Sequence, residues 1–490
     1  MDATVQQVKF FFTEMPMETA NLIVGLLGLL TIVAIVVTLF KSKTQPAIAF
    51  IVFPAILGVL LVLSGRYSLE NLSAMIKSGF SSTGPTAALF VFSVLYFGIM
   101  TDAGMFDVII NKLMRFVGDS VVGVCMMTAV IALIGHLDGG GASTFCIVIP
   151  AMLPVFKRMH MRKTTLLRIA VLAMGVLNLM PWAGPTMRAA TVLGIEAGEL
   201  WSTLLPIQIF GVVLALVHAF LAGLQEKKRG AGLHGKLAQE HGEVVLDEDV
   251  QAAATASDLA RPKLFWFNAL LTIAVIALLI LGDSFDLPTY VPFMLGTAIA
   301  LFVNYGFTAK MHKKIINLHA GPALMMCSTL MGAAVLMGIL TSNFNDAGSV
   351  MKVKETMSTD PTIPSVVSCL AGIVAKILPD FLGQNLPLVI GILSVPLALA
   401  FDTDSYFYGM LPVIIAIGQS FGVDAVKVAV AMVVCRNCAT FISPMVPATL
   451  LGTGLAEVDI KDHIKASFMY VWIFSILCMV FAIIWGIMPL

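Results

Sequence analysis

Charged residues are scarce in this chain, and this scarcity excludes most classes of soluble protein. Only 12% of its 490 residues are Asp, Glu, Lys or Arg, whereas 59% are hydrophobic. Soluble domains carry about a quarter of charged residues. The 29 basic residues balance the 29 acidic ones, so no basic excess indicates binding to nucleic acid. The composition therefore predicts an integral membrane protein whose partner is the lipid bilayer.

Motifs of soluble enzymes and metalloproteins are missing as well. Residues 230–236 resemble a phosphate-binding loop, but Leu237 stands where a Ser or Thr would hold magnesium. Cys435 and Cys438 form a C-x-x-C pair without a second Cys or His pair nearby, so the seven cysteines predict small buried side chains. Residues 1–18 lack the basic region and cleavage site of a signal peptide. We expect no catalytic residue, no resident cofactor and no enzymatic activity.

Long apolar runs predict about ten membrane-spanning helices, because about 20 apolar residues of helix cross roughly 30 Å of hydrocarbon. Two of the runs are interrupted by prolines, which predicts broken helices. The continuous runs are 21–40, 46–64, 85–101, 202–224, 264–281, 291–305, 322–341 and 468–487, and the interrupted ones are 166–194 and 425–452.

Polar residues interrupt the apolar sequence at two further places, which we name the first tip, H-L-D-G-G-G-A-S-T at 136–144, and the second tip, F-D-T-D-S at 401–405. Each tip lies between apolar limbs of about 15 residues, which rise only about 22 Å as helices and are too short to cross the bilayer. Polar backbone survives at membrane depth only where it lines a protein cavity. We therefore predict two re-entrant hairpins with their tips near the middle of the membrane.

The two halves of the chain share motifs in the same order. Asn178, Pro185 and A-T-V-L-G at 190–194 correspond to Asn437, Pro444 and A-T-L-L-G at 448–452. Each half would hold five spans and one hairpin, and an odd number inserts the second copy from the opposite side. We therefore predict a polytopic all-α protein of two inverted repeats. The predicted parts are repeat 1–224 with hairpin 121–160 and broken helix 165–195, linker 225–263, and repeat 264–490 with hairpin 385–421 and broken helix 425–455.

Basic residues predict the orientation in the membrane. Placing linker 225–263 in the cytoplasm also places most loop Lys and Arg residues inside, which is the usual bias. These residues are Lys41, Lys43, Lys112, Arg115, Lys157, Arg158, Arg162, Lys163, Lys310, Lys313 and Lys314. The N-terminus then lies outside an inner (cytoplasmic) membrane. Residues 361–382 have no counterpart in the first half and predict an extra interfacial helix.

Three carboxylates stand at the tips, namely Asp138, Asp402 and Asp404. An ionised carboxylate at membrane depth costs about 2.5–3.5 kcal/mol, so these groups predict coupling to a proton or cation. The alternative is that an Asp caps the helical limb that follows it. Because Asp402 and Asp404 are two residues apart, one could cap while the other binds. We expect His136 to be a packed residue of the first tip.

Hydroxyl side chains begin the second limb of each hairpin, at Ser143, Thr144, Thr403 and Ser405. Hydroxyls, free backbone N–H groups and the positive end of a helix together favour an anion such as a carboxylate. The alternative is a bond from each hydroxyl to a carbonyl of the preceding turn. Gly141 would let a ligand approach the backbone closely or would simply form a tight turn.

The broken helices carry two asparagines and two arginines. Asn178 and Asn437 precede the prolines, where freed carbonyls and an amide favour a cation or a proton-linked site. Arg188 and Arg436 stay charged and can bind a carboxylate with two parallel hydrogen bonds. Arg436 would either bind substrate or neutralise the acids of the second tip. Arg188 could instead reach the outer interface.

Three signatures resemble those of the citrate–metal:proton symporters of the ion transporter superfamily. The first is L-D-G-x-G-A-S-T at 137–144 with P-A-M-L-P at 150–154, the second is M-P-W-x-G-P-T-x-R-A-A at 180–190, and the third is S-P-x-V-P at 443–447. The resemblance implies a homodimer whose transport domains move like an elevator against a scaffold. It also implies uptake of citrate, usually with a divalent metal, together with protons. An acid usually stands at Gly140 in that family, so a carboxylate carried without metal is the other possibility.

From the residues and the resemblance together, we predict secondary active transport of citrate or a related di- or tricarboxylate, with Mg²⁺ or Ca²⁺ as a possible co-transported ion and H⁺ as the coupling ion. The alternatives are Na⁺-coupled symport of a dicarboxylate and an anion channel. The predicted substrate-binding residues are Gly141, Ser143, Thr144, Gly184, Pro185, Thr186, Arg188, Thr403, Ser405, Arg436 and Ser443. The predicted coupling residues are Asp138, Asn178, Asp402, Asp404 and Asn437, and no metal ligand is assigned.

Overall fold

A computed structural model describes residues 7–11, 13–41, 44–115, 120–233, 235–237, 258–281, 287–344, 350–351 and 363–488. The central part of the predicted linker, 238–257, lies outside the described residues. Within them the chain is almost entirely helical, with two short antiparallel strand pairs, β1 (Gln7–Phe10) with β2 (Thr13–Pro16) and β3 (Asn343–Phe344) with β4 (Val350–Met351).

The helices of the first half end at residue 229. They are α1 (Met17–Phe40), α2 (Pro46–Leu63), α3 (Leu69–Asp102), α4 (Met105–Met114), α5 (Val121–Gly135), η1 (His136–Asp138), α6 (Gly141–Arg158), α7 (Lys163–Leu177), α8 (Gly184–Leu193) and α9 (Ala197–Arg229).

The helices of the second half begin at residue 262. They are η3 (Pro262–Leu264), α11 (Phe265–Leu281), α12 (Tyr290–Tyr305), α13 (Ala309–Thr341), α14 (Val366–Ala375), α15 (Asp380–Gln384), α16 (Leu386–Ala400), η6 (Ser405–Met410), α17 (Leu411–Ser420), α18 (Ala425–Arg436), η7 (Cys438–Ile442), α19 (Pro447–Leu455) and α20 (Ile460–Ile484).

Nine helices among the described residues are long and apolar enough to cross a membrane, which confirms the predicted class of all-α polytopic membrane protein. Several helices are longer than the apolar runs that predicted them. α3 begins at Leu69, sixteen residues before the predicted span, because Ser68 and Asn71 close a reciprocal N-terminal cap. Polar turns outside the hydrocarbon continue such a helix without contributing to its hydrophobic signal.

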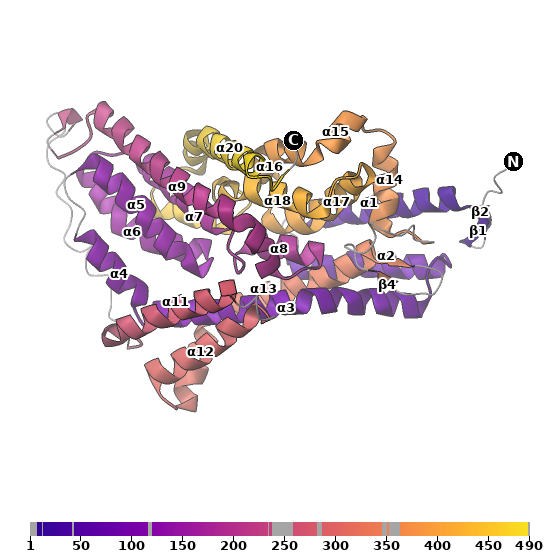
Figure 1. Ribbon diagram of the computed structural model, residues 1–490, viewed down its shortest axis with the longest axis horizontal. Coiled ribbons are helices and arrows are strands. Elements are labelled where there is room, and N and C mark those ends of the chain that lie inside the picture. Colours follow the sequence, from indigo (N-terminus) through magenta and orange to yellow (C-terminus); the bar gives the residue numbers. More distant parts are fainter. Residues whose placement is uncertain are drawn as a thin grey trace.

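One group of helices is built around the long pair α3 and α13, with α2 and α12 packed against them. The two backbones approach closely because of glycine. A Cβ atom on Gly79 would lie 1.9 Å from the Ala334 carbonyl oxygen, and one on Gly338 would lie 2.2 Å from that of Met75. Small residues of this kind let helices pack tightly in lipid. Figure 1 shows α3 and α13 side by side along the long axis of the molecule.

A second group contains α5–α9 and α16–α20, with α7 and α18 at its centre (Figure 1). Every residue of α7 from Thr165 to Leu177 is buried, and so is nearly all of α18. A helix that is buried on all sides lies in the core rather than against lipid. Both central helices end in breaks, between Leu177 and Gly184 in the first half and between Arg436 and Pro447 in the second.

The prolines of the breaks begin new helices. Pro185 lies in the first turn of α8 and Pro447 in the first turn of α19. A proline is tolerated there because its missing N–H would have no partner within the helix. Pro444 lies in the connection before α19. The breaks are therefore connections between separate helices, the second of which contains the short 3-10 helix η7, and not kinks within one continuous helix.

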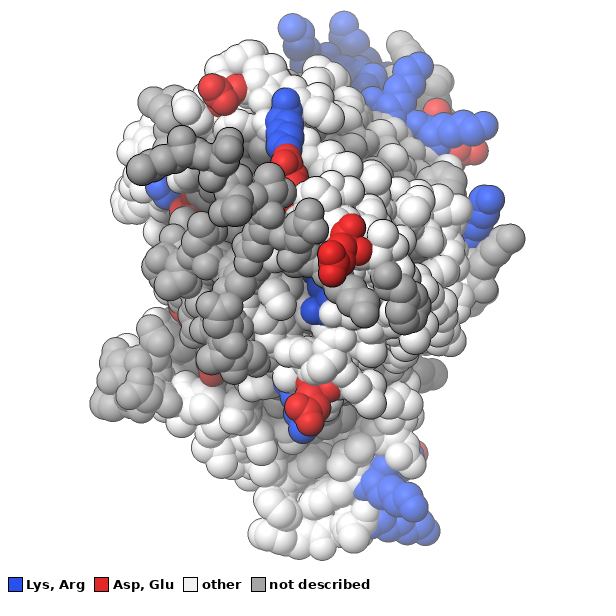
Figure 2. Space-filling view, turned by 90° about the vertical axis from the view of Figure 1, so that its right-hand side faces the viewer, with Lys and Arg blue, Asp and Glu red and all other residues white. Residues whose placement is uncertain are grey.

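The described parts of the chain place the N-terminal strands and the end of α9 at opposite ends. In Figure 1, β1, β2 and α14 lie at one end of the long axis, and the end of α9 lies at the other. The extra segment at 361–382 forms α14 and the start of α15, and α14 packs between α1 and α17. Figure 2 looks onto the end that carries α14 and shows scattered charged groups on a mostly uncharged surface.

Candidate functional site

The first tip is a tight turn whose acid accepts hydrogen bonds from the start of the helix that follows. Gly139 has a positive φ of 70° and leads from η1 into α6. The Asp138 carboxylate accepts hydrogen bonds from the Gly140 N–H at 2.8 Å and from the Ser143 hydroxyl. A Cβ atom on Gly140 would lie 2.5 Å from the Ser143 Oγ and 3.0 Å from Asp138 Oδ2. Glycine at this position therefore lets the carboxylate and the hydroxyl meet.

A buried histidine connects the first tip to the first break. His136 is fully buried, and its ring nitrogens lie 2.7 Å from the Thr144 Oγ1 and 3.2 Å from the Asn178 Oδ1. The Thr144 hydroxyl also lies 2.7 Å from the carbonyl oxygen of Gly140, four residues back, which is the local bond expected as the alternative to anion binding. The Trp182 indole donates to the Leu137 carbonyl at 2.8 Å. Neutral groups therefore fix the position of this tip.

The two breaks meet at their asparagines. The Asn178 side-chain amide donates to the backbone carbonyl of Asn437 at 3.3 Å. The Thr186 hydroxyl at the start of α8 donates to the Asn178 carbonyl at 3.0 Å. The Asn437 side-chain oxygen is buried and has no hydrogen-bond partner among the described residues. Ser443 is also buried in the second break, where its hydroxyl accepts from the Met445 N–H at 3.2 Å.

At the second tip the two acids have different roles. The Asp402 carboxylate accepts from the N–H groups of Asp404 and Ser405, at 2.8 and 2.9 Å, and from the Ser405 hydroxyl at 2.7 Å. It therefore caps η6, a π-helical turn, which is an irregularity often found at functional sites. The Thr403 hydroxyl forms no hydrogen bond with another described residue. The Asp404 carboxylate takes no part in this cap and interacts instead with a residue that is distant in the sequence.

That interaction is an ion pair between the two halves of the chain. The Arg188 Nε donates to Asp404 Oδ1 at 2.6 Å, and the side chains are only 7% and 16% exposed. A Cβ atom on Gly184 would lie 2.6 Å from the Arg188 Nη1, so this glycine leaves room for the guanidinium. The alternative in which Arg188 reaches the outer interface is wrong, because the carboxylate holds it inside the protein.

Arg436 is the largest fully buried side chain of the described residues, and its hydrogen bonding is incomplete. Its Nη2 donates to the Phe401 carbonyl at 2.9 Å, and its guanidinium carbon lies 4.7 Å from the centre of the Tyr406 ring. Its Nε and Nη1 have no partner in the described structure. Buried polar atoms are nearly always hydrogen-bonded, so unsatisfied donors on a cation indicate a place for another acceptor.

Each tip also packs against the broken helix of the other half. The first tip and α6 pack against η7 and α19, where a Cβ atom on Gly141 would lie 2.5 Å from Phe441 and one on Gly452 would lie 2.8 Å from the Phe145 ring. The second tip packs against α8 through Arg188 and Asp404. Close approach at Gly141 thus serves packing between the halves.

Most of the predicted residues form two clusters, and the Asn178–Asn437 contact joins the breaks beside them. One cluster contains Asp138, Gly141, Ser143, Thr144, Asn178 and Thr186, and the other contains Gly184, Arg188, Asp402, Asp404, Ser405 and Arg436. No described hydrogen bond or ion pair links Pro185, Thr403 or Ser443 to either cluster. Sequence reasoning missed Tyr406 and the Phe401 carbonyl, which together hold Arg436. The aromatic residue directly after the second tip, Tyr406, was the signal in the sequence that could have found this contact.

The part of the chain that is described holds no group of three His, Cys, Asp or Glu suited to a metal.

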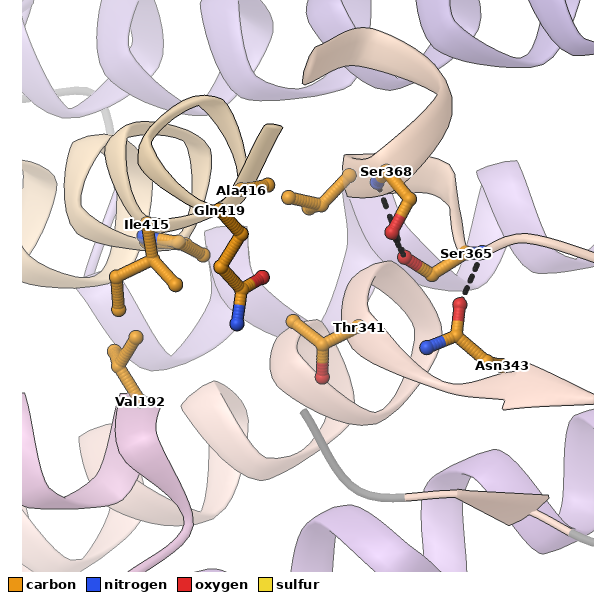
Figure 3. A pocket seen from close by; sticks show the side chains of 10 residues that line it. Val192, Thr341, Asn343, Ser365, Ser368, Ile415, Ala416 and Gln419 are labelled. Carbon is orange, nitrogen blue, oxygen red and sulfur yellow. Dashed lines mark hydrogen bonds between the residues drawn. The ribbon is translucent and has the colours of Figure 1, made fainter. Parts of the chain in front are cut away.

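A narrow crevice lies one helical turn beyond Arg188. Its cavity volume is only about 20 Å³, and it lies between the end of α8, the end of α13, α14 and α17. A second hollow of about 30 Å³ shares Val192 and Thr341 with it. Figure 3 shows the Gln419 amide and the Thr341 side chain at this space, with Asn343 bonded to Ser365 at its side. The Thr341 hydroxyl donates to the Met337 carbonyl of its own helix. The crevice is lined by hydroxyl, amide and apolar groups and lies beside the contact of α8 with the α3–α13 pair.

Comparisons with known proteins agree on one family. The citrate transporter family model matches residues 10–371. In Bacillus subtilis (strain 168), a citrate transporter is 32% identical over 441 residues, covering 90% of this chain and 94% of the relative. A Mg²⁺/citrate complex secondary transporter of the same organism is 31% identical over 443 residues, covering 90% and 93%.

A solved structure shares the fold. The YdaH transporter of Alcanivorax borkumensis superposes with a TM-score of 0.56, covering 91% of this chain and 100% of that chain. Its sequence is 16% identical, so the likeness concerns the fold alone.

Proposed function

Because this chain belongs to the citrate transporter family, we propose that it carries out secondary active transport of citrate or a related di- or tricarboxylate. The observation that carries the proposal is the pair of buried guanidinium groups, Arg188 and Arg436, at the meeting point of the second tip and both broken helices. A guanidinium remains charged at any working pH and binds carboxylates in a fixed bidentate geometry. Two of them suit a substrate with two or more carboxylates.

The cost of moving the substrate makes coupling necessary. Each elementary charge moved across 100 mV costs about 2.3 kcal/mol, so a trivalent anion entering an inside-negative cell faces roughly 7 kcal/mol. A divalent metal bound to the substrate would cancel two of these charges. One relative is a transporter of the Mg²⁺/citrate complex, so we treat Mg²⁺ or Ca²⁺ as part of the cargo. Protons on Asp138, Asp402 or Asp404 would supply the remaining compensation.

The packing suggests how the site reaches both sides of the membrane. The tips and broken helices pack mainly with one another, whereas α2, α3, α12 and α13 form a separate group. Between them, α8 faces small and hydroxyl side chains such as Ser78, Gly79 and Ser82 across the second hollow. We propose that the α3–α13 group is a scaffold that pairs two copies in a homodimer, and that the site slides against it in an elevator movement. The linker would then lie in the cytoplasm and the N-terminus outside.

The test is uptake of labelled citrate into proteoliposomes, with and without Mg²⁺ and Ca²⁺. Proton coupling predicts faster uptake when the outside is acid, and no acceleration by Na⁺ relative to choline. Acceleration by Na⁺ alone would instead support Na⁺-coupled dicarboxylate symport. A carrier also predicts saturable counterflow, in which internal citrate drives entry of the label. Currents without counterflow would overturn the carrier in favour of an anion channel.

A further inference from the structure

The second tip provides one acceptor to each of the two buried arginines. Arg188 donates a hydrogen bond to the Asp404 carboxylate at 2.6 Å, and Arg436 donates one to the Phe401 carbonyl at 2.9 Å. These two acceptors lie three residues apart on one turn, although the two arginines come from different halves of the chain. The tip therefore presents to the arginines a carboxylate and a carbonyl oxygen, which are the groups that a polycarboxylate substrate would also present.

We propose that the second tip is a built-in substitute for the substrate, and that a proton on Asp404 exchanges one for the other. A protonated Asp404 loses its charge and with it most of its attraction for Arg188, so the guanidinium becomes available to a carboxylate of the substrate. Deprotonation restores the internal ion pair and expels the substrate. The inference rests on the proposed function and adds to it the residue and contact by which a proton would be coupled to the cargo.

Charge balance supports this exchange. Arg188 and Arg436 carry two positive charges, and Asp402 and Asp404 carry two negative charges, so the cluster is neutral when no proton is added. Burying an uncompensated charge is expensive, and removal of one partner of a buried ion pair typically costs about 3–5 kcal/mol. A substrate carboxylate that replaces the carboxylate of Asp404 keeps the site neutral only if Asp404 has taken up a proton.

Asp404 is better placed for this role than its neighbour. Both oxygens of Asp402 are used by N–H and hydroxyl donors of its own turn, which move with it. The charged and titratable groups that face Asp404 are Arg188 on α8, Arg436 on α18, and Asp402 and Tyr408 on its own segment. α1 and α13 also pack against η6. The charged residue of α1, Glu18, pairs with Lys376, and α13 contributes the Met326 sulfur, which lies 3.4 Å from Arg188.

The experiment measures citrate binding to the purified full chain at pH 6, 7 and 8, with and without Mg²⁺, by titration calorimetry. If one proton is taken up with the substrate, wild-type affinity falls up to about tenfold for each added pH unit. Asp404→Asn should remove this dependence and bind at pH 8 at least as tightly as the wild type does at pH 6. Protonation of citrate itself is the same for both proteins and cancels in the comparison.

Glu457→Gln is the matched control, because it makes the same change from carboxylate to amide outside both tips, at a residue paired with Lys157 and Lys163. It should keep the wild-type affinity and the wild-type slope of affinity against pH. A second measurement uses the wild type alone: citrate added in weak buffer with a pH indicator should cause net uptake of a proton. An Asp404→Asn variant with the wild-type slope, or wild-type binding without proton uptake, would overturn the exchange while leaving citrate transport intact. Absence of any citrate binding or uptake by the wild type would overturn the proposed function itself.

Discussion

The first tip, 136–144, and the second tip, 401–405, occupy corresponding places in the two halves, yet they are held by different forces. At the first tip, a buried imidazole, an amide and a hydroxyl form a neutral network, and the Asp138 carboxylate accepts hydrogen bonds within its own turn. At the second tip, Asp404 forms an ion pair with Arg188 from the other half. A proton on Asp404 would remove one charge of this ion pair, whereas the first tip has no ion pair among its described contacts. We therefore expect the second tip to respond to protonation of Asp404 and the first tip mainly to position the site.

The largest expected effect comes from breaking the ion pair on its basic side. Arg188→Met leaves Asp404 buried without a cation and should lower the free energy of unfolding by about 3–5 kcal/mol, with loss of citrate uptake. Thermal unfolding in detergent and uptake into proteoliposomes measure the two effects. The double variant Arg188→Met/Asp404→Leu removes the orphaned charge and should recover stability without recovering uptake. A stable single variant with normal uptake would contradict the role of the pair.

The neutral network of the first tip predicts an intermediate effect. Asn178→Ala removes the partner of His136 and leaves the Asn437 carbonyl unsatisfied, which should cost about 1–3 kcal/mol of stability. The slope of citrate affinity against pH should stay as in the wild type. Asn385→Ala, which removes an exposed bond to the Phe381 carbonyl, is the control and should change the unfolding temperature much less. A changed pH slope in Asn178→Ala would refute the division of roles between the tips.

Packing of the first tip against α19 can be tested with two glycines of the same helix. Gly452→Ala would place a Cβ atom 2.8 Å from the Phe145 ring and should destabilise the protein by about 1–3 kcal/mol through overpacking. Gly454→Ala meets no atom within 4 Å, and alanine is the better helix former by up to about 1 kcal/mol. Gly454→Ala should therefore raise the unfolding temperature slightly. Equal shifts for both variants would show that the close approach is unimportant.

The smallest effect is expected outside both tips. Glu457, between α19 and α20, bonds Lys157 at 2.8 Å and Lys163 at 2.5 Å, and these hydrogen bonds lower its pKa from 4.5 to about 2. Since its side chain is 55% exposed, Glu457→Gln should cost less than about 1 kcal/mol.

A depressed pKa gives stability that is fully present above pH 4.5 and is lost as the pH falls toward 2. The difference in unfolding temperature between wild type and Glu457→Gln should therefore be constant from pH 8 to pH 5 and shrink below pH 4.5. It should also shrink in high salt, which screens exposed charges. A difference that persists at pH 3 would exclude the ion pairs as its cause.

The sequence by itself determined the helical membrane architecture and the location of its interruptions. Apolar runs must become helices in lipid because every backbone polar group needs a partner, and polar residues inside such runs mark where the helices stop. For this reason the limbs α5, α6 and α16 begin and end within a few residues of the predicted limits. Helix ends in polar regions were less predictable, as at Leu69 of α3, because the helix there continues without an apolar signal.

Only the tertiary structure decided what each polar residue of the tips does. Asp402 and Asp404 are two residues apart and chemically identical, and the sequence left open which one caps and which one pairs. The choice depends on Arg188, 216 residues away, whose position follows from the packing of α8 against the second tip. Similarly, Arg436 meets the Phe401 carbonyl and the Tyr406 ring only because α16, η6 and α18 fold together. Local sequence sets where a chain must bend in a membrane, whereas partners for buried charges come from segments that packing brings together.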